Sequence, residues 1–416
     1  MFWKKKANEP TPPASEAAPT PPAPLPAALP SVPGKDHAAQ LAVVLTRRAG
    51  PQVAPMTPDA VDAHMRALDS LLADPASQGV VRDIAAEQIE PAFAALERNA
   101  ADARDAAKWR RAGAIMYGID GPRARRAYEQ AFTLEPRHFW GAIFVARLRA
   151  LAQDLAGANE AAAAAILAGQ TPDERGTAFF EAALVALGRE DFDAVLSYGA
   201  QAVDASRGAI KAGARDAFAL RDYVARLTLL ADANVVRQDF ATAQRLYAEA
   251  LVGARKLSDA ARGASAVKKG VAELLEKSAS VAASAPDPES AMRFSAEAVS
   301  IWRTILAAGG EPGAQGALAA ALNSMGEALR LAGQVEAAKF TLREALETAR
   351  AASASNPADP TARRDVSLAL WRLAHIGAAG VTWAQVAEAM ESAAASGALN
   401  PKHQHFLDEA RRRAAA

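Results

Sequence analysis

A small residue recurs at nearly regular intervals through most of this 416-residue chain, and this recurrence limits the folds that are open to it. The positions are Ala124, Ala158, Val195, Ala243, Ala291, Ala338 and Ala387. They are 34, 37, 48, 48, 47 and 49 residues apart. Periods of this length indicate tandem copies of one supersecondary unit, which buries its apolar side chains by stacking on its neighbours. We therefore expect an array of stacked units.

A second alanine lies seven residues after each of these positions. These alanines are Ala131, Ala165, Ala202, Ala250, Ala298, Ala345 and Ala394. In the first six units a larger apolar residue follows, namely Phe132, Ile166, Val203, Leu251, Val299 and Leu346. A small residue lets neighbouring helices approach closely, and the large residue fills the space beyond it. The pattern predicts a buried face on the second helix of each unit.

The clearest unit covers residues 317–350. Apolar periodicity predicts two amphipathic helices there, joined by a tight turn at Gly333-Gln334. Gly326 in the first helix marks a place where the partner helix comes close. The apolar face of the second helix consists of Ala338, Leu342, Ala345 and Leu346.

The small and large positions of this unit resemble the tetratricopeptide repeat. The residues that carry the resemblance are Leu322, Met325, Gly326, Leu329, Val335, Ala338, Leu342 and Ala345. The resemblance implies an all-α, right-handed superhelical solenoid of antiparallel helix pairs, with the first helix of each pair lining the concave wall. The longer units are similar to the lengthened repeats of kinesin light chain-like proteins. They depart from the family pattern because they lack its proline after the second helix.

Composition supports the all-α prediction. Alanine is far more frequent than in ordinary proteins, aromatic residues make up 6% of the sequence, and runs of Val, Ile and Thr are nearly absent. Lys plus Arg and Asp plus Glu both number 47, so no net field attracts nucleic acid, and we predict no nucleic-acid partner. The sequence has no cysteine, which argues against disulfides, thiolate metal sites and a bacterial lipoprotein anchor. We expect a bacterial, cytoplasmic protein.

The sequence divides into four predicted parts. Prolines are dense at the N-terminus, and proline removes backbone donors and blocks helix formation, so this part should be a disordered tether. The next part should be helical without a clear repeat, the third should be the array, and the last should be a capping helix. Their ranges are 1–34, 35–120, 121–395 and 396–416.

Two interpretations of the first residues stay open. Phe2 and Trp3 precede Lys4, Lys5 and Lys6, and such rings and cations suit the inner face of an anionic membrane. At about 1 kcal/mol per basic residue the contact would be weak and peripheral. The alternative is an ordinary start with a solubilising charge cluster. No window approaches the ~18 consecutive apolar residues of a spanning helix, and the start does not resemble a secretory signal.

Local signals predict several helix boundaries. Thr57-Pro58 should begin a helix, because threonine caps well and proline fits the first turn. His64 on its apolar face is expected to be packed, since no second metal ligand lies at helical spacing. The pattern of residues 80–96 predicts one helix bent at Pro91. Further caps are predicted at Thr171 with Glu174, at Asp287, at Thr382 with Gln385, and at Asn400.

No enzymatic template fits the sequence. It has no GxxxxGK[ST] loop, no GxGxxG after a strand and no GxSxG elbow. Ser265 and Lys268 have Ser-x-x-Lys spacing, which a sequence rich in alanine and lysine produces by chance. His403 and His405 lie two apart on a predicted helix and so point to different sides. We predict no enzyme, no metal site and no cofactor.

The predicted function is protein binding. If the resemblance holds, the residues that face the concave groove include Trp140, Ile143, Arg147, Thr228, Asp232, Asn323, Glu327, Arg330 and Arg372. Their mixed charges suit an amphipathic helix or an extended peptide. The first hypothesis is a non-enzymatic adaptor or scaffold. The alternatives are a regulatory module that a peptide reshapes, and an assembly factor tethered to a membrane through its N-terminus. The partner's identity and the oligomeric state stay open.

Overall fold

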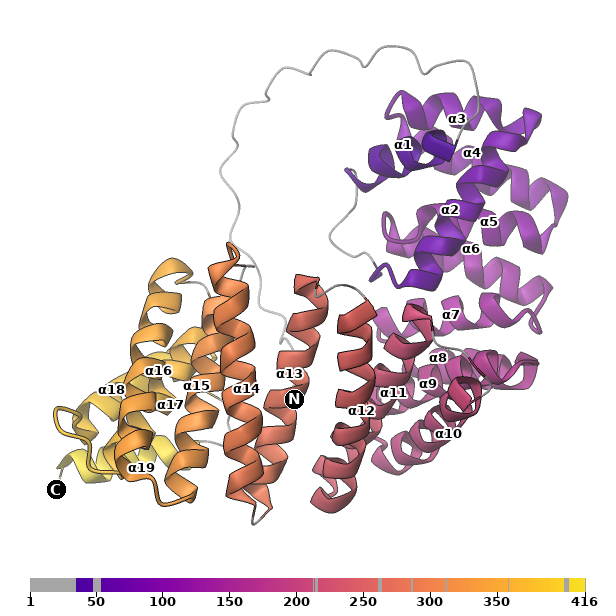
Figure 1. The fold of residues 1–416 in the computed structure, drawn as a ribbon. Helices are drawn as coiled ribbons and strands as arrows, with labels where there is room; N and C mark the ends of the chain where they lie inside the picture. The colour runs from indigo at the N-terminus through magenta and orange to yellow at the C-terminus, as the bar shows by residue number, and fades with distance from the viewer. Residues whose placement is uncertain are drawn as a thin grey trace, which may run out of the picture. The chain divides into compact units, whose positions relative to one another are not determined.

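The computed structural model describes residues 35–47, 54–211, 213, 216–260, 264–285, 287–310, 313–357, 359–399 and 404–415. Throughout these ranges the protein is helical and contains no strand (Figure 1). The prediction of an all-α fold is confirmed. The predicted tether, including Phe2, Trp3 and Lys4 to Lys6, lies outside the described residues, as does the predicted cap at Asn400.

The protein forms two compact units, and the division between Ala202 and Val203 falls within helix α10. The helices that begin in the first unit are α1 (Lys35–Thr46), α2 (Pro58–Ala73), α3 (Gln78–Ala85), α4 (Ile89–Ala103), α5 (Ala106–Met116), α6 (Gly121–Leu134), α7 (Phe139–Leu151), α8 (Leu155–Ala168), α9 (Pro172–Gly188) and α10 (Phe192–Lys211). A 3₁₀ turn, η1 (Pro75–Ser77), precedes α3.

The second unit continues with nine further helices among its described residues. These are α11 (Ala217–Val236), α12 (Phe240–Ala260), α13 (Ser265–Ser284), α14 (Pro288–Ala307), α15 (Ala314–Leu331), α16 (Val335–Ser355), α17 (Pro360–His375), α18 (Trp383–Ala395) and α19 (Gln404–Ala415). None of the described helices is both long and apolar enough to span a membrane.

Consecutive helices pack as pairs. In the first unit α5 packs with α6 and α7 with α8; in the second, α11 packs with α12, α13 with α14, α15 with α16, and α17 with α18. Within each unit the second helix of a pair also contacts the first helix of the next, as α6 does with α7 and α14 with α15. The predicted array of stacked helix pairs is confirmed.

The seam between helices consists of the predicted small residues. The first six repeat positions, from Ala124 to Ala338, are completely buried, and the alanines seven residues later are at most 1% exposed. In α18 the register differs from the prediction by one residue. Val386 and Ala393 are completely buried there, whereas Ala394 is half-buried. The observed register buries Val386 and Met390, which contribute more apolar area than the alternatives Ala387 and Glu391.

The hairpin at residues 317–350 has the expected turn and close approach. Gly333 has φ of +75°, a left-handed conformation that favours glycine. A Cβ on Gly326 would lie 2.5 Å from Leu342 on the partner helix. The predicted lengthening is also present, because α12, α14 and α16 have 21, 20 and 21 residues. Helices α6 and α8 have 14 residues each.

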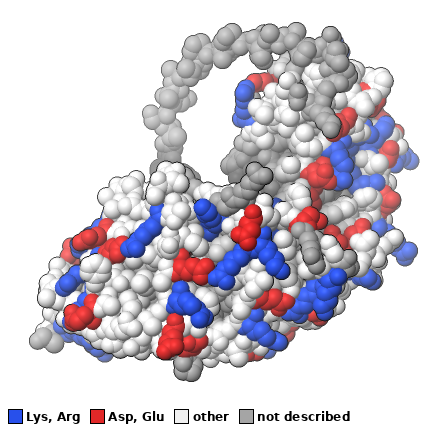
Figure 2. Space-filling view, viewed as in Figure 1, with Lys and Arg blue, Asp and Glu red and all other residues white. Residues whose placement is uncertain are grey.

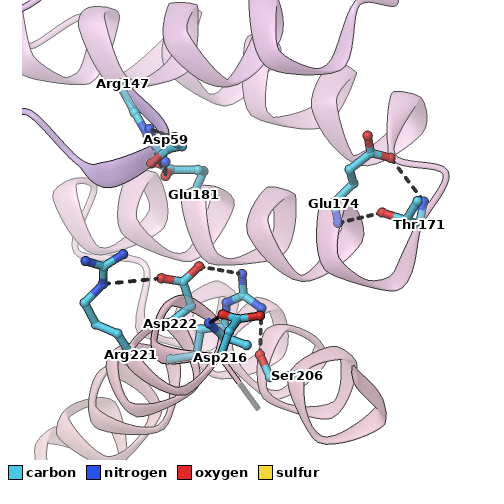
Figure 3. Close-up of polar contacts among 11 residues, drawn as sticks. Asp59, Arg147, Thr171, Glu174, Glu181, Ser206, Asp216, Arg221 and Asp222 are labelled. Carbon is cyan, nitrogen blue, oxygen red and sulfur yellow. Dashed lines mark hydrogen bonds and ion pairs between the residues drawn. The ribbon is translucent and has the colours of Figure 1, made fainter. Parts of the chain in front are cut away.

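Most predicted caps are confirmed. Thr171 and Thr382 each form both hydrogen bonds of a capping box (Figure 3 shows Thr171 with Glu174). Asp287 accepts a hydrogen bond from the backbone N–H of Ser290 at 3.1 Å. Thr57 occupies the cap position of α2, but its hydroxyl does not cap the helix.

The prediction of one helix bent at Pro91 is wrong. Two helices, α3 and α4, are separated by a short break in which Glu87 has φ of +58°. Pro91 lies in the first turn of α4, where its missing N–H leaves no intrahelical hydrogen bond unmade. The backbone therefore breaks before the proline instead of bending at it.

Candidate binding groove

A pocket of about 520 Å³ opens between α2, α5 and α7 in the first unit. We call it the α2–α5–α7 groove. Its floor consists of Ala63, Ala67, Ala114, Tyr128 and Phe144. Around this floor lie Asp59, Asp62, Arg66, Ser70, Arg110, Arg111, His138, Trp140 and Gly141. The groove thus combines apolar side chains below with charged, hydroxyl and ring N–H groups above.

The walls are fixed by buried polar contacts and caps. The buried His64 ring on α2 has its Nδ1 2.9 Å from the carbonyl oxygen of Ala114 on α5. Burial lowers the pKa of His64, so this histidine is neutral and packed, as predicted. Asp105 caps α5 by accepting from the N–H of Ala107 at 2.7 Å. The groove therefore lies between helices whose spacing and starting points are set locally.

Tyr128 forms part of the floor because Gly113 leaves room for its ring. A Cβ on Gly113 would lie 2.6 Å from Tyr128 Cδ2. The Tyr128 ring stacks on Phe144, with centroids 4.9 Å apart. Tyr128 is 2% exposed, and burial raises the pKa of its phenol well above the ordinary value.

Arg147 on α7 joins three segments at one end of the groove (Figure 3). Its Nε donates to Glu181 Oε1 on α9 at 2.7 Å, and its Nη1 donates to Thr57 Oγ1 at 3.1 Å and to Asp59 Oδ2. Burial acts to lower the pKa of Arg147, but Glu181 and Asp59 together hold that pKa above its usual value. The hydroxyl of Thr57 thus anchors Arg147 instead of capping α2.

The predicted groove residues of α7 differ in their accessibility. Trp140 is half-buried, lines the groove and packs edge-on against Phe139 at 5.1 Å. Ile143 is completely buried with Phe139, Ala142 and other core residues, so it faces the interior. Arg147 borders the groove with its hydrogen bonds already made.

In the second unit, Asp232 and Thr228 lie on α11. Asp232 Oδ2 lies 2.5 Å from Lys277 Nζ on α13, and Asp232 Oδ1 accepts a hydrogen bond from the Tyr247 hydroxyl. The Thr228 hydroxyl donates to the carbonyl of Val224 in its own helix at 2.7 Å. The polar atoms of both predicted residues therefore already have partners.

The other four predicted residues meet on α15 and α17. Arg330 donates to both carboxylate oxygens of Glu327, at 3.0 and 2.7 Å. Arg372 Nη1 donates to the carbonyl oxygen of Asn323 at 2.7 Å, and its Nε lies 3.6 Å from Glu327 Oε2. Asn323 is 1% exposed and is part of the interface between α15 and α17. The structure thus brings these four residues together as one mutually paired cluster.

No protein-family model matches the sequence, and no curated protein matches it. Among solved structures the protein is similar to BtubC from P. vanneervenii, with 19% identity over 62% of this sequence and 92% of BtubC, and a TM-score of 0.42. It is similar to the apo form of RapI, with 14% identity over 85% of this sequence and 97% of RapI, and a TM-score of 0.49. It is also similar to YrrB, a tetratricopeptide repeat protein with an unusual peptide-binding site, with 16% identity over 50% of this sequence and 92% of YrrB, and a TM-score of 0.34. With TM-scores below 0.5, these likenesses carry no argument about what this protein binds.

Most residues of the α2–α5–α7 groove were not predicted from sequence. Arg66, Arg110 and Arg111 lie before residue 121, in the part where the repeat is not visible. His138 has no metal-ligand partner at a suitable spacing in the sequence. Its position three residues before Gly141 is the spacing of a helix cap, and Nδ1 accepts from the Gly141 N–H at 3.0 Å. That spacing was the available signal, but histidine is outside the usual set of capping residues.

Proposed function

We propose that this protein is a non-enzymatic binding scaffold whose α2–α5–α7 groove holds a segment of a protein or peptide. The observation that carries the proposal is the groove itself, whose volume of about 520 Å³ lies within the range typical of ligand sites. Its apolar floor offers buried area, and its polar rim offers orientation.

The polar contacts around the groove favour binding over chemistry. Arg110 Nη1 lies 2.5 Å from Glu135, and Arg147 is held between Asp59 and Glu181. These carboxylates are therefore engaged in holding helices together. Within the described ranges, no group of three or more Asp, Glu or His residues is placed to hold a metal ion.

Trp140 is the residue whose loss should most weaken binding, because large half-buried rings are the usual anchors of protein interfaces. Peptides selected from a displayed library against the full-length protein should bind Trp140→Ala at least about tenfold more weakly than the original protein, a change of about 1.4 kcal/mol. Isothermal titration with each selected peptide measures this change.

A matched aromatic truncation provides the control. Phe340 on α16 in the second unit is 72% exposed, so Phe340→Ala removes a ring without opening a core. Peptide affinity should be unchanged in this variant. If Trp140→Ala binds every selected peptide as well as the original protein does, the groove is not the binding site and the proposal fails.

A further inference from the structure

Several hydrogen-bond donors of the α2–α5–α7 groove have no acceptor within the described part of the protein. The first belongs to Arg111 on α5, whose side chain is 28% exposed. Its guanidinium lies 3.6 Å from Asp74 Oδ2, too far for a hydrogen bond, and makes none with any other described residue. Asp74 is itself engaged, because it accepts from the Ala76 N–H at 3.0 Å and from the Ser77 hydroxyl at 2.8 Å.

Two ring N–H groups add to this set. Since His138 Nδ1 accepts from Gly141, the hydrogen of the neutral ring is on Nε2. Burial and the charge of Arg110 lower the pKa of His138, which keeps the ring neutral. Neither His138 Nε2 nor Trp140 Nε1 has a hydrogen-bond partner among the described residues, and both rings line the groove.

Tyr128 contributes a donor from the floor. It is 2% exposed and lines the groove, yet its hydroxyl has no hydrogen-bond partner in the described ranges. A buried hydroxyl without a partner is destabilising by about 1–3 kcal/mol, so an acceptor supplied by a ligand would remove an existing deficit.

The acceptors at the rim are already paired with arginines. Asp59 is bound by Arg147, and Asp62 lies 2.9 Å from Arg66. The nearby Glu135 is paired with Arg110. The groove therefore has spare donors on Arg111, His138, Trp140 and Tyr128, whereas its carboxylates are engaged. Spare donors around an apolar floor suit a ligand that brings an acceptor together with an apolar group.

We infer that the α2–α5–α7 groove recognises a peptide carboxylate adjacent to a large apolar residue. The Arg111 guanidinium binds the carboxylate, since its planar fork can donate two parallel hydrogen bonds to one carboxylate. The apolar neighbour packs against Trp140 and Phe144. The carboxylate comes from a Glu or Asp residue or from the C-terminus of the peptide. This inference rests on the function proposed above, because it names the chemistry of the ligand in the same groove.

Peptide selection against the full-length protein tests the inference. One library displays random seven-residue peptides internally, and a second displays them with a free C-terminus. Peptides whose binding is weakened by Trp140→Ala are then synthesised as C-terminal amides and as free acids, with each acidic residue present or changed to its amide. We expect at least a tenfold preference for the carboxylate form. A preference that persists in the C-terminal amides identifies a side-chain carboxylate, and one confined to the free acids identifies the C-terminal carboxylate.

Arg111→Gln should abolish this preference, so that carboxylate and amide peptides bind equally. The control is Arg98→Gln on α4, which removes an exposed arginine that does not line the groove and should leave the preference intact. Peptides that depend on Trp140 but prefer no carboxylate overturn the inference and leave the proposed function standing. A carboxylate preference that survives Arg111→Gln also overturns it. Peptides that are indifferent to Trp140→Ala overturn the proposed function, and this inference with it.

Discussion

At the residue scale, the first unit depends on charges that are removed from water in matched groups. Arg147 satisfies Asp59, Glu181 and Thr57 at once, and its side chain is only 15% exposed. Three segments far apart in sequence are joined by this one guanidinium. Breaking such a cluster by removing one member leaves uncompensated buried charge, which is far more costly than losing a surface ion pair.

Arg147→Met should therefore lower the free energy of unfolding by about 3–5 kcal/mol, because Asp59 and Glu181 would both lose their partner. Urea denaturation followed by circular dichroism measures the change. Arg66→Met is the matched control, since Arg66 and Asp62 form an exposed pair with 68% and 61% of their side chains accessible. The control should change stability by less than about 1 kcal/mol. Equal effects of the two substitutions would contradict the structural role of Arg147.

A buried carboxyl in the second unit predicts a dependence on pH. Glu276 on α13 accepts a hydrogen bond from Trp302 Nε1 at 2.6 Å. Burial raises the pKa of Glu276 from 4.5 to about 7, although the Trp302 bond opposes this shift. The folded state thus holds a proton that the unfolded state releases near pH 4.5. This contribution to stability is complete below pH 4.5 and is lost as the pH rises through about 7.

The free energy of unfolding should fall by roughly 3 kcal/mol more in the original protein than in Glu276→Gln when the pH is raised from 4.5 to 8. Glutamine keeps an acceptor for Trp302 but carries no titrating proton. Urea denaturation of both proteins across this range isolates the contribution of Glu276. Parallel curves for the two proteins would show that Glu276 titrates normally.

At the element scale, each hairpin depends on where small residues allow two helices to meet. Gly326 on α15 faces Leu342 on α16, and an added Cβ would lie 2.5 Å from it. Gly316 is in the same helix, but a Cβ there would meet nothing within 4 Å. The two glycines therefore separate the effect of packing from the effect of helix propensity.

Gly326→Ala should destabilise the protein by about 1–3 kcal/mol through overpacking. Gly316→Ala should stabilise it by about 0.5–1 kcal/mol, because alanine restricts the unfolded state and favours helix. Thermal denaturation of both variants gives the comparison. A stabilising Gly326→Ala would mean that α15 and α16 are further apart than the structure places them.

Sequence reasoning succeeded for elements whose signal is local or repeated. The small residues of the seam, the Gly333 turn and the capping boxes all follow from spacing within one unit. It failed where the outcome depends on distant partners. The Thr57 hydroxyl binds Arg147, 90 residues away, and no local pattern could show that its capping bond would be absent. The break before Pro91 could not be told from a bend, because both fit the same apolar period.

At the scale of the whole molecule, the change in repeat length coincides with the division into two units. Repeat positions are 34 and 37 residues apart up to Val195 and 47–49 residues apart beyond it, and the units divide between Ala202 and Val203. Charges on the face shown in Figure 2 are interspersed, with acidic and basic residues side by side. The equal totals of acidic and basic residues anticipated this mixture.

The candidate site was predictable only in part. The position of Trp140 on a first helix predicts that it faces a groove, whereas Ile143, one turn further along α7, is completely buried. Helix α7 is buried on more than one face, so a simple two-sided helix pattern cannot tell which residues stay open. The arginines of α2 and α5 precede the visible repeat, and therefore the groove they form with α7 had no sequence signature.

Hydrogen exchange measured by mass spectrometry on the full-length protein, with and without a saturating selected peptide, tests the central claim most directly. The account predicts slower exchange concentrated in residues 58–73, 106–116 and 139–151, with little change in residues 288–307 and 335–355. Protection concentrated in the latter two segments, with none in the first three, would contradict it.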